Sequence, residues 1–341
     1  MVDEATVNAA RAGDTEAFRA LTDRYRHELH LHCYRLLGSV ADAEDVLQET
    51  LLAAWRGLAE FEGRSSVRAW LYRIATNRCL NALRDARRRP AEVPPPPFDP
   101  PPPTRHGDLP WLQPYPDVLL RQLIDATPDP EAQSQIRETV ELAFVAWLQA
   151  LPPRQAASLV LRDVLGYSTA EVATMLQTTT TAVKGALQRA RASIDQRRRA
   201  RERHAPPARG SAAERRISRA FAEAFVADDI DGVIALLTDD AWLAMPPAPH
   251  VYQAPAAIGA FFQASAHWRA GRRFHLRPTS ANLQPAFAFY LADAAGRAAH
   301  AEGVMVLDLH GDRIGTITRF LDPHLPRRFG LPTTIELSGQ D

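Results

Sequence analysis

The chain has 341 residues, enough for two or three domains, and its 40 basic residues balance its 40 acidic ones. The overall charge therefore gives no sign of a polyanionic partner, and only the local distribution of charge is informative. Two cysteines, Cys33 and Cys79, exclude a disulfide framework. The charged N-terminus and the absence of a long apolar run predict a cytoplasmic protein without a membrane segment.

The first part of the chain, from Asp14 to Arg88, is predicted to be helical. One helix should end at Gly38-Ser39, and Ser39 or Asp42 can cap the next. The outer side of that second helix carries an acidic stripe, Asp42, Asp45 and Glu49. These carboxylates either complement the helix dipole or form a docking face for a basic partner.

A third helix is predicted from about Ser66 to Arg88. Its apolar side is opposed by Arg73, Asn77, Asn81 and Arg84, with Trp70 among them. Guanidinium and amide groups beside an indole suit single-stranded DNA, in which bases stack and phosphates pair with arginine. Alternatively, Trp70 packs against a neighbouring helix.

Between Pro90 and Pro130 lie just over half of the 27 prolines. This density predicts an extended tether. Its aromatic segment, Trp111–Pro116, is expected to dock against a domain.

Helix resumes near Glu131 with an apolar stripe that runs to Leu151, and a helix-turn-helix is predicted over Asp163–Ile194. Ser168 and Glu171 form a capping box for its first helix, and Thr180 or Thr181 can cap the second. Four polar residues of the second helix share one outward arc: Thr181, Lys184, Gln188 and Arg191. Such a helix can enter a major groove, and the cation-rich run to Arg203 can follow phosphates. An ordinary solvated helix is the alternative.

From Ala212 the pattern becomes α+β. Helices are predicted over Ile217–Ala227, Asp231–Leu237 and Ile258–Ala266. Beyond Phe274 apolar residues alternate between turns, which predicts an antiparallel meander. The expected fold is a curved sheet, or cone, covered on one face by helices.

Three segments together resemble a known family: DAEDVLQETLLAAW (Asp42–Trp55), FEGRSSVRAWLYRIATNRCLNALR (Phe61–Arg84) and LPPRQAASLVLRDVLGYSTAEVATML (Leu151–Leu176). They are similar to regions 2 and 4 of extracytoplasmic-function sigma factors of bacterial RNA polymerase. HLHCYRLLGSV (His30–Val40) looks like the start of region 2. The cluster His27, His30, His32 and Cys33 could suggest a metal site, but the resemblance explains these residues without a metal.

The resemblance implies a role for each surface. Asp42, Asp45 and Glu49 would face the β′ clamp helices of core RNA polymerase, and region 4 would also touch the β flap. Trp70, Arg73, Asn77 and Arg78 would lie where the −10 element is opened. The residues implied for the −35 element are Thr180, Thr181, Lys184, Gln188, Arg189 and Arg191.

The chain departs from the usual family pattern by about 130 further residues, which look like a SnoaL-like (NTF2-like) domain. Sigma factors with such extensions form recognised subgroups, in which the extension is thought to regulate the factor. The segments that carry this second resemblance are Trp242–Phe262 and Gly311–Pro323.

The expected organisation is therefore multidomain, with two all-α domains and an α+β SnoaL-like cone. The boundaries are region 2 over 10–90, a Pro-rich linker over 91–130, region 4 over 131–204, a short linker over 205–211 and the cone over 212–330.

SnoaL-like cones enclose a pocket, and some are cyclases or isomerases. His250 and His267 could act as acids or bases, but neither has an acidic residue beside it in sequence. We therefore expect no enzyme, no cofactor and no metal, and a cone that either binds a small molecule or docks on protein. An enzyme tethered to a DNA-binding module is the alternative. The candidate pocket residues are Trp242, Met245, Tyr252, Phe262, His267, Trp268, Phe289 and Arg319.

Overall fold

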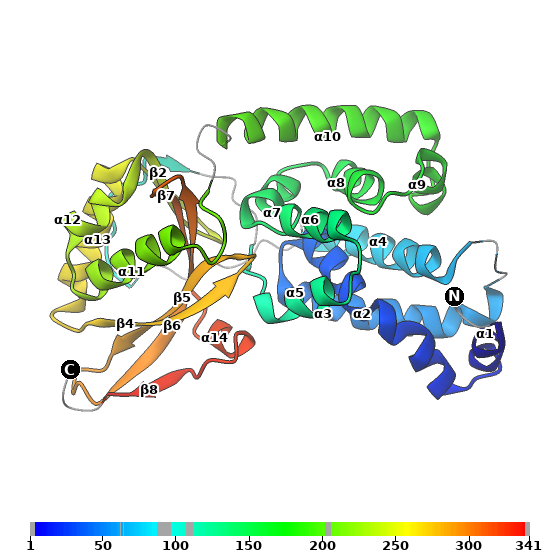
Figure 1. Cartoon of the computed structure of the whole chain (residues 1–341), viewed down its shortest axis with the longest axis horizontal. Helices are drawn as coiled ribbons and strands as arrows, with labels where there is room; N and C mark the ends of the chain where they lie inside the picture. The colour runs from blue at the N-terminus through cyan, green and yellow to red at the C-terminus, as the bar shows by residue number, and fades with distance from the viewer. Residues whose placement is uncertain are drawn as a thin grey trace. The chain divides into compact units, whose positions relative to one another are not determined.

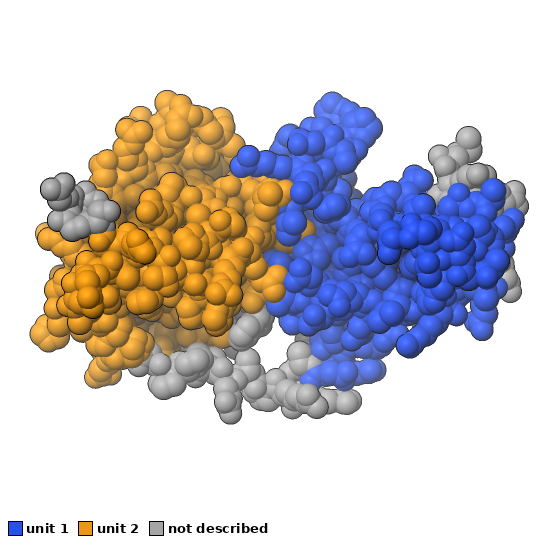
Figure 2. Space-filling view, turned by 90° about the horizontal axis from the view of Figure 1, so that it is seen from below, with its two compact units in different colours: residues 1–90, 119–197 blue, residues 91–118, 198–341 orange. Residues whose placement is uncertain are grey.

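The computed structural model describes residues 4–61, 63, 65–86, 97–106, 112–201 and 206–337. It divides into two compact units (Figures 1 and 2). Unit 1 combines Met1–Pro90 with Leu119–Arg197, and unit 2 combines Ala91–Val118 with Arg198–Asp341. The chain thus enters unit 2, returns to unit 1 and leaves it again, so the predicted linker is not simply a spacer.

The N-terminal part of unit 1 is helical, as predicted. Asp14 caps α2, and its carboxylate accepts hydrogen bonds from the amides of Glu16 and Ala17. Gly38 ends that helix in the left-handed conformation, and the Ser39 side chain caps α3. The helices here are α1 (Glu4–Arg11), α2 (Thr15–Leu37), α3 (Val40–Gly57), the 3-10 turn η1 (Leu58–Glu60) and α4 (Val67–Ala86).

The second helical part of unit 1 differs from the prediction at its start, because the helix expected from Glu131 to Leu151 is interrupted. The Thr139 hydroxyl donates to the Gln135 carbonyl, and the Thr139 carbonyl accepts a hydrogen bond from Arg35 instead of continuing the helix. The elements are α5 (Asp117–Asp125), which lies within the predicted linker, then α6 (Pro130–Glu138), α7 (Leu142–Gln149), α8 (Pro153–Leu159), the π-helical turn η2 (Val160–Val164), α9 (Thr169–Met175) and α10 (Thr180–Arg201).

Unit 2 is an α+β domain built on a curved, mixed sheet in the order β1-β3-β2-β7-β6-β5-β4, with β8 paired to β6. The antiparallel meander β4–β7 agrees with the prediction, whereas β2 pairs with β7 in parallel. The strands are β1 (Arg105–His106), β2 (Leu237–Met245), β3 (Ala248–Gln253), β4 (Phe274–Ala281), β5 (Gln284–Ala292), β6 (Ala298–His310), β7 (Arg313–Phe320) and β8 (Thr334–Glu336).

Three helices cover one face of this sheet (Figure 1): α11 (Ala212–Val226), α12 (Ile230–Ala235) and α13 (Pro255–Arg269). A short helix, α14 (Leu325–Arg328), follows β7. The core between helices and sheet is rich in phenylalanine and includes Phe221, Phe261 and Phe289. Burial of these large rings stabilises the domain.

The described parts of the Pro-rich segment pack on the cone. Strand β1 adds to the edge of the sheet beside β3, and the Tyr252 hydroxyl donates to the Pro101 carbonyl. Farther on, the Tyr115 amide donates to Asn282, and the Leu283 amide donates to the Asp117 carboxylate. The predicted docking of the aromatic segment is therefore confirmed for its described residues, while Trp111 lies outside them.

Candidate functional site

The helix-turn-helix is assembled by short-range hydrogen bonds that the sequence encodes. The Ser168 amide donates to the Glu171 carboxylate at 2.8 Å, and the Glu171 amide donates to the Ser168 hydroxyl at 3.2 Å. These hydrogen bonds lower the pKa of Glu171 below its ordinary value. The second helix is capped by Thr179, whose hydroxyl accepts from the Ala182 amide at 3.1 Å. The expectation that Thr180 or Thr181 supplies this cap is wrong by one or two residues.

Helix α10 separates an apolar face from a polar one. Val183, Leu187, Ala190 and Ile194 are buried, as predicted. All six residues implied for the −35 element are exposed: Thr180, Thr181, Lys184, Gln188, Arg189 and Arg191. This helix thus presents a mainly polar surface, suited in its residue types to base edges and phosphates.

One member of that surface already has a protein partner. The Arg191 Nε and Nη2 atoms donate to the two carboxylate oxygens of Asp163 at 2.8 and 2.6 Å. These hydrogen bonds raise the pKa of Arg191. Asp163 therefore fixes the orientation of the guanidinium through Nε and Nη2, and Nη1 can donate to a further acceptor.

On α4, the structure favours the packing alternative for Trp70. The indole is 6% exposed and lies against Phe61, with ring centroids 4.9 Å apart. Arg73 and Arg78 are exposed, whereas Asn77 is half-buried and donates to the Met175 carbonyl of α9 at 3.4 Å. Trp70 thus supports the face from within rather than offering an open stacking surface.

The acidic stripe of α3 is fully accessible and has an apolar neighbour that sequence reasoning missed. Asp42, Asp45 and Glu49 are all exposed, and Glu49 lies 3.6 Å from Arg78. Leu52, three residues beyond Glu49 on the same helical face, is 57% exposed. A single exposed apolar side chain does not by itself mark an interface. Its position next to the acidic stripe is the feature that its spacing in the sequence could have identified.

The two helical parts of unit 1 contact each other through buried polar groups. Arg35 of α2 donates to the Thr139 carbonyl and hydroxyl at 3.2 and 2.6 Å. Gln149 of α7 donates to the carbonyls of Arg35 and Leu36. With the hydrogen bond from Asn77 to Met175, these contacts hold the α4 face close to the helix-turn-helix.

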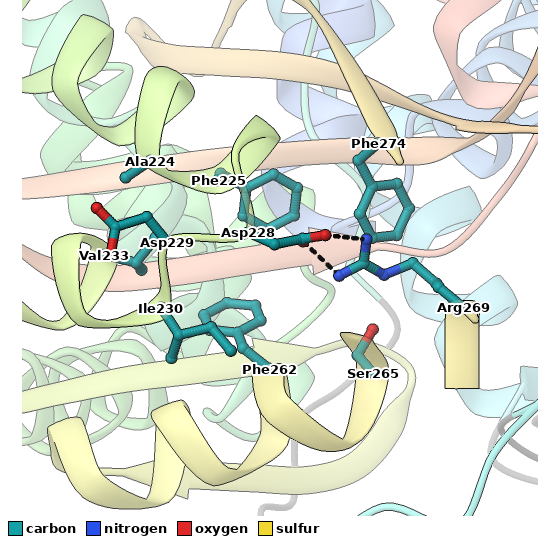
Figure 3. Close-up of a pocket in the computed structure, with 10 residues that line it drawn as sticks. All are labelled: Ala224, Phe225, Asp228, Asp229, Ile230, Val233, Phe262, Ser265, Arg269 and Phe274. Atoms are coloured by element: carbon teal, nitrogen blue, oxygen red, sulfur yellow. Dashed lines mark hydrogen bonds and ion pairs between the residues drawn. The ribbon is translucent and has the colours of Figure 1, made fainter. Parts of the chain in front are cut away.

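The cone has a pocket between α11, α12 and α13, of about 290 Å³ including space open to solvent (Figure 3). Its polar residues include an ion pair in which Arg269 Nη2 and Nη1 donate to Asp228 at 2.6 and 3.1 Å, together with Asp229 and Ser265. Apolar side chains form most of the remaining wall. The lining residues are Ala224, Phe225, Asp228, Asp229, Ile230, Val233, Phe262, Ser265, Arg269 and Phe274.

Of the predicted pocket residues, Phe262 lines this pocket. Met245, Tyr252 and Phe289 are buried in the packed core, Trp242 is half-buried and His267 is exposed. His267 is exposed because it lies on the outer side of α13. Among the described residues no group of three potential ligands is arranged for a metal ion, and no helix is long and apolar enough to span a bilayer.

Comparisons with known proteins identify the parts of the chain that carry these helices and the cone. Family models match residues 21–89 as "Sigma-70 region 2", 142–194 as "Sigma-70, region 4" and 218–317 as "SnoaL-like domain". The chain is 42% identical over 329 residues to the ECF RNA polymerase sigma factor SigG of Mycobacterium tuberculosis, covering 95% of this chain and 86% of SigG.

Two further similarities differ in extent. The chain is 30% identical to the RNA polymerase sigma-H factor of Pseudomonas aeruginosa, over 57% of this chain and 92% of that protein. The fold resembles the crystal structure of Mycobacterium tuberculosis SigJ, an extracytoplasmic-function sigma factor, with a TM-score of 0.56 and 22% identity over 94% of this chain and all of that one. The last similarity concerns the fold alone.

Proposed function

The chain belongs to the extracytoplasmic-function sigma factors of bacterial RNA polymerase, and from this membership we propose how its surfaces divide the work of promoter recognition. The protein binds core RNA polymerase and directs promoter-specific initiation of transcription. The observation that carries the assignment of surfaces is the exposed polar face of α10 on a capped helix-turn-helix. By the same membership, it acts in the cytoplasm.

In this proposal, α10 reads the −35 element in the major groove. Lys184 and Arg189 pair with phosphates, while Gln188 and the Asp163-oriented Arg191 approach base edges. Arg73, Asn77 and Arg78 of α4 meet the −10 strand as it opens. The buried side chain of Trp70 packs beneath this face and supports it.

We assign the stripe Asp42, Asp45, Glu49 and Leu52 to the β′ clamp helices of core polymerase. Carboxylates steer a basic partner to the surface, and the exposed leucine supplies apolar contact once the surfaces meet. The ion pair between Glu49 and Arg78 joins this surface to the −10 face on the neighbouring helix.

Promoter binding must also separate the two helical parts of unit 1. Asn77 lies 3.4 Å from the Met175 carbonyl, whereas promoter elements more than one helical turn of DNA apart are separated by over about 34 Å. The polar contacts of Arg35 and Gln149 with their partners are therefore the ones that polymerase and DNA replace.

The cone is proposed to regulate these steps. Its sheet and turns hold both ends of the described linker, through β1 and through the contacts of Tyr115 and Asp117. Since this linker connects the two DNA-reading parts, holding it restricts how far they can move apart. A small-molecule ligand or a docked protein would alter that restriction.

The assignment of the α3 stripe is tested by transcription with purified core polymerase and a genomic promoter library. Asp45→Arg and Leu52→Asp are each expected to weaken core binding at least about tenfold, because one reverses the charge and the other removes the apolar contact. Core affinity is measured by biolayer interferometry and transcripts by run-off sequencing.

Asp23→Arg is the control, since Asp23 is exposed on α2 away from the stripe. Normal core affinity in both stripe variants would contradict the assignment of this surface. If no promoter-specific transcripts formed even with core present, the result would instead favour the alternative of an enzyme tethered to DNA.

The reading helix is tested by footprinting on a promoter fragment with polymerase present. Arg191→Ala is expected to weaken −35 binding by about 1–3 kcal/mol and to relax base preference, and Lys184→Ala to lower affinity evenly and flatten the salt dependence. Arg19→Ala, exposed on α2, is the control. Unchanged footprints for both Arg191→Ala and Lys184→Ala would exclude α10 as the reader.

A further inference from the structure

The interior of the cone contains a cation without an anionic partner. Arg319, on β7, is only 5% exposed, and its Nε atom is buried without a hydrogen-bond partner among the described residues. It lies opposite Met305 of β6 in the strand register. A guanidinium in such surroundings has lost most of its hydrogen bonds to water, and protein acceptors have not replaced them.

Aromatic rings make up much of its environment. The Arg319 guanidinium carbon lies 4.8 Å from the ring centroid of Phe289, 5.8 Å from that of Phe274 and 6.0 Å from that of Phe261. These cation–π contacts attract the charge, but each is weaker than the cost of removing a cation from water. The rings orient the guanidinium without neutralising it.

Nearby charged groups do not neutralise it either. Glu302, on β6, influences Arg319 electrostatically, yet no ion pair within 4 Å forms between them in the described part of the chain. Burial lowers the pKa of Arg319 to about 10, although the charge of Glu302 acts in the opposite direction, and burial raises the pKa of Glu302. Arg319 is thus still charged at neutral pH, and no carboxylate among the described residues forms an ion pair with it.

A second buried arginine provides an internal comparison. Arg269, 4% exposed, has two hydrogen bonds to Asp228 and a third to the Arg272 carbonyl, so its charge is balanced. Its Nε, like that of Arg319, is buried without a partner among the described residues, so the missing ion pair is what distinguishes Arg319. Its guanidinium lies 4.6 Å from the ring centroid of Phe274, which Arg319 also approaches. Phe274 lines the pocket in Figure 3, whereas Arg319 does not, so the ring of Phe274 lies next to both the pocket and the Arg319 guanidinium.

We propose that the cone binds a small carboxylate with an apolar body, and that Arg319 holds the carboxylate group. The planar guanidinium pairs with two carboxylate oxygens, and the rings of Phe261, Phe274 and Phe289 suit an aromatic or alkyl body. Inorganic phosphate carries a negative charge but has no apolar part that could pack against those rings. The inference deepens the regulatory role proposed for the cone, but its binding test does not depend on transcription.

The test uses the full-length chain with benzoate as the carboxylate probe, and inorganic phosphate and benzyl alcohol as comparison probes. Benzoate at millimolar concentration is expected to raise the melting temperature and to slow amide exchange in peptides from β5 and β7. Phosphate and benzyl alcohol, which each lack one half of the recognised chemistry, should produce neither effect.

Arg319→Met removes the charge at similar length and is expected to weaken benzoate binding at least tenfold. Arg319→Lys, which keeps the charge but not the two-pronged geometry, should weaken it by a smaller factor. Arg313→Met is the matched control, because Arg313 is an exposed arginine on the same strand, and it should bind like the wild type.

Equal benzoate affinity in wild type and Arg319→Met would overturn the proposal, as would the absence of any benzoate effect on the wild type. If Arg319→Met does not fold, amide exchange in the wild type decides the question. Protection confined to peptides outside β5 and β7 would then exclude this site, and protection of both strands supports it. If the wild-type protein bound benzoate as expected but did not support transcription with core polymerase, the proposed function would be contradicted. The binding site at Arg319 would still stand.

Discussion

Gly303→Ala is expected to unfold the cone while the helical unit remains folded. Gly303 has a backbone φ of +152°, which a residue with a side chain rarely adopts, and it occupies the irregular pairing where Phe289 and Tyr290 of β5 meet β6. A Cβ placed there would lie 1.8 Å from the Phe320 carbonyl oxygen. Because that oxygen belongs to the backbone of β7, no side-chain rotation relieves the clash, and we expect a loss of at least about 3 kcal/mol.

The matched control is Gly296→Ala in the turn between β5 and β6. Gly296 also has a positive φ, +66°, but a Cβ there would meet no atom within 4 Å. Only the left-handed backbone cost of about 1 kcal/mol should appear. Hydrogen exchange resolved by peptide measures both variants, with peptides of α2 and α4 reporting on unit 1.

The same pair of variants tests regulation. If the cone restrains the linker, Gly303→Ala should change promoter-specific transcription several-fold, whereas Gly296→Ala should leave it near the wild-type level. A cone that unfolds in Gly303→Ala without any change in transcription would exclude a regulatory role for the folded domain.

Sequence reasoning succeeded for most features that local interactions determine, although it misplaced the cap of α10, which Thr179 supplies. The capping box of Ser168 and Glu171 and the end of α2 at Gly38 involve residues close in the chain, so spacing alone predicts them. The period of Val183 and Leu187 likewise identified the buried face of α10.

It failed where a distant residue decides the outcome. The helix break at Thr139 depends on Arg35, more than a hundred residues earlier. Burial of Trp70 depends on Phe61, which helical spacing cannot place. The parallel pairing of β2 with β7 and the packing of the Pro-rich segment on the cone are set by tertiary contacts that no local pattern encodes. The assignment of individual residues to −10, −35 and polymerase contacts remains a prediction.

His32 is the basis of the second prediction, that unit 1 loses stability in mild acid. This side chain is completely buried, and its Nε2 lies 2.9 Å from the Thr76 hydroxyl. Since that hydroxyl donates its own proton to the Tyr72 carbonyl, the network assigns the proton on the imidazole to Nε2. The other nitrogen, Nδ1, is buried without a partner among the described residues.

Protonation at Nδ1 would therefore bury a charged donor without an acceptor. Burial, together with the positive charges of Arg35 and Arg68, lowers the pKa of His32 from 6.5 to about 3. Between these values the unfolded chain binds a proton that the folded chain does not. The contribution of the neutral imidazole is thus fully present above pH 6.5 and is lost as the pH falls toward 3, by about 1.4 kcal/mol for each pH unit.

Urea unfolding followed by circular dichroism between pH 7.5 and 5 measures this slope. His32→Gln keeps a polar group near Thr76 but cannot titrate, so it should be less stable than the wild type at pH 7.5 and lose less stability on acidification. His27→Gln, exposed on the same helix, should retain the wild-type slope because it leaves the buried imidazole in place. Parallel pH profiles for wild type and His32→Gln would mean that other groups, chiefly carboxylates, account for the acid sensitivity, and that His32 is already protonated or solvated in the folded protein.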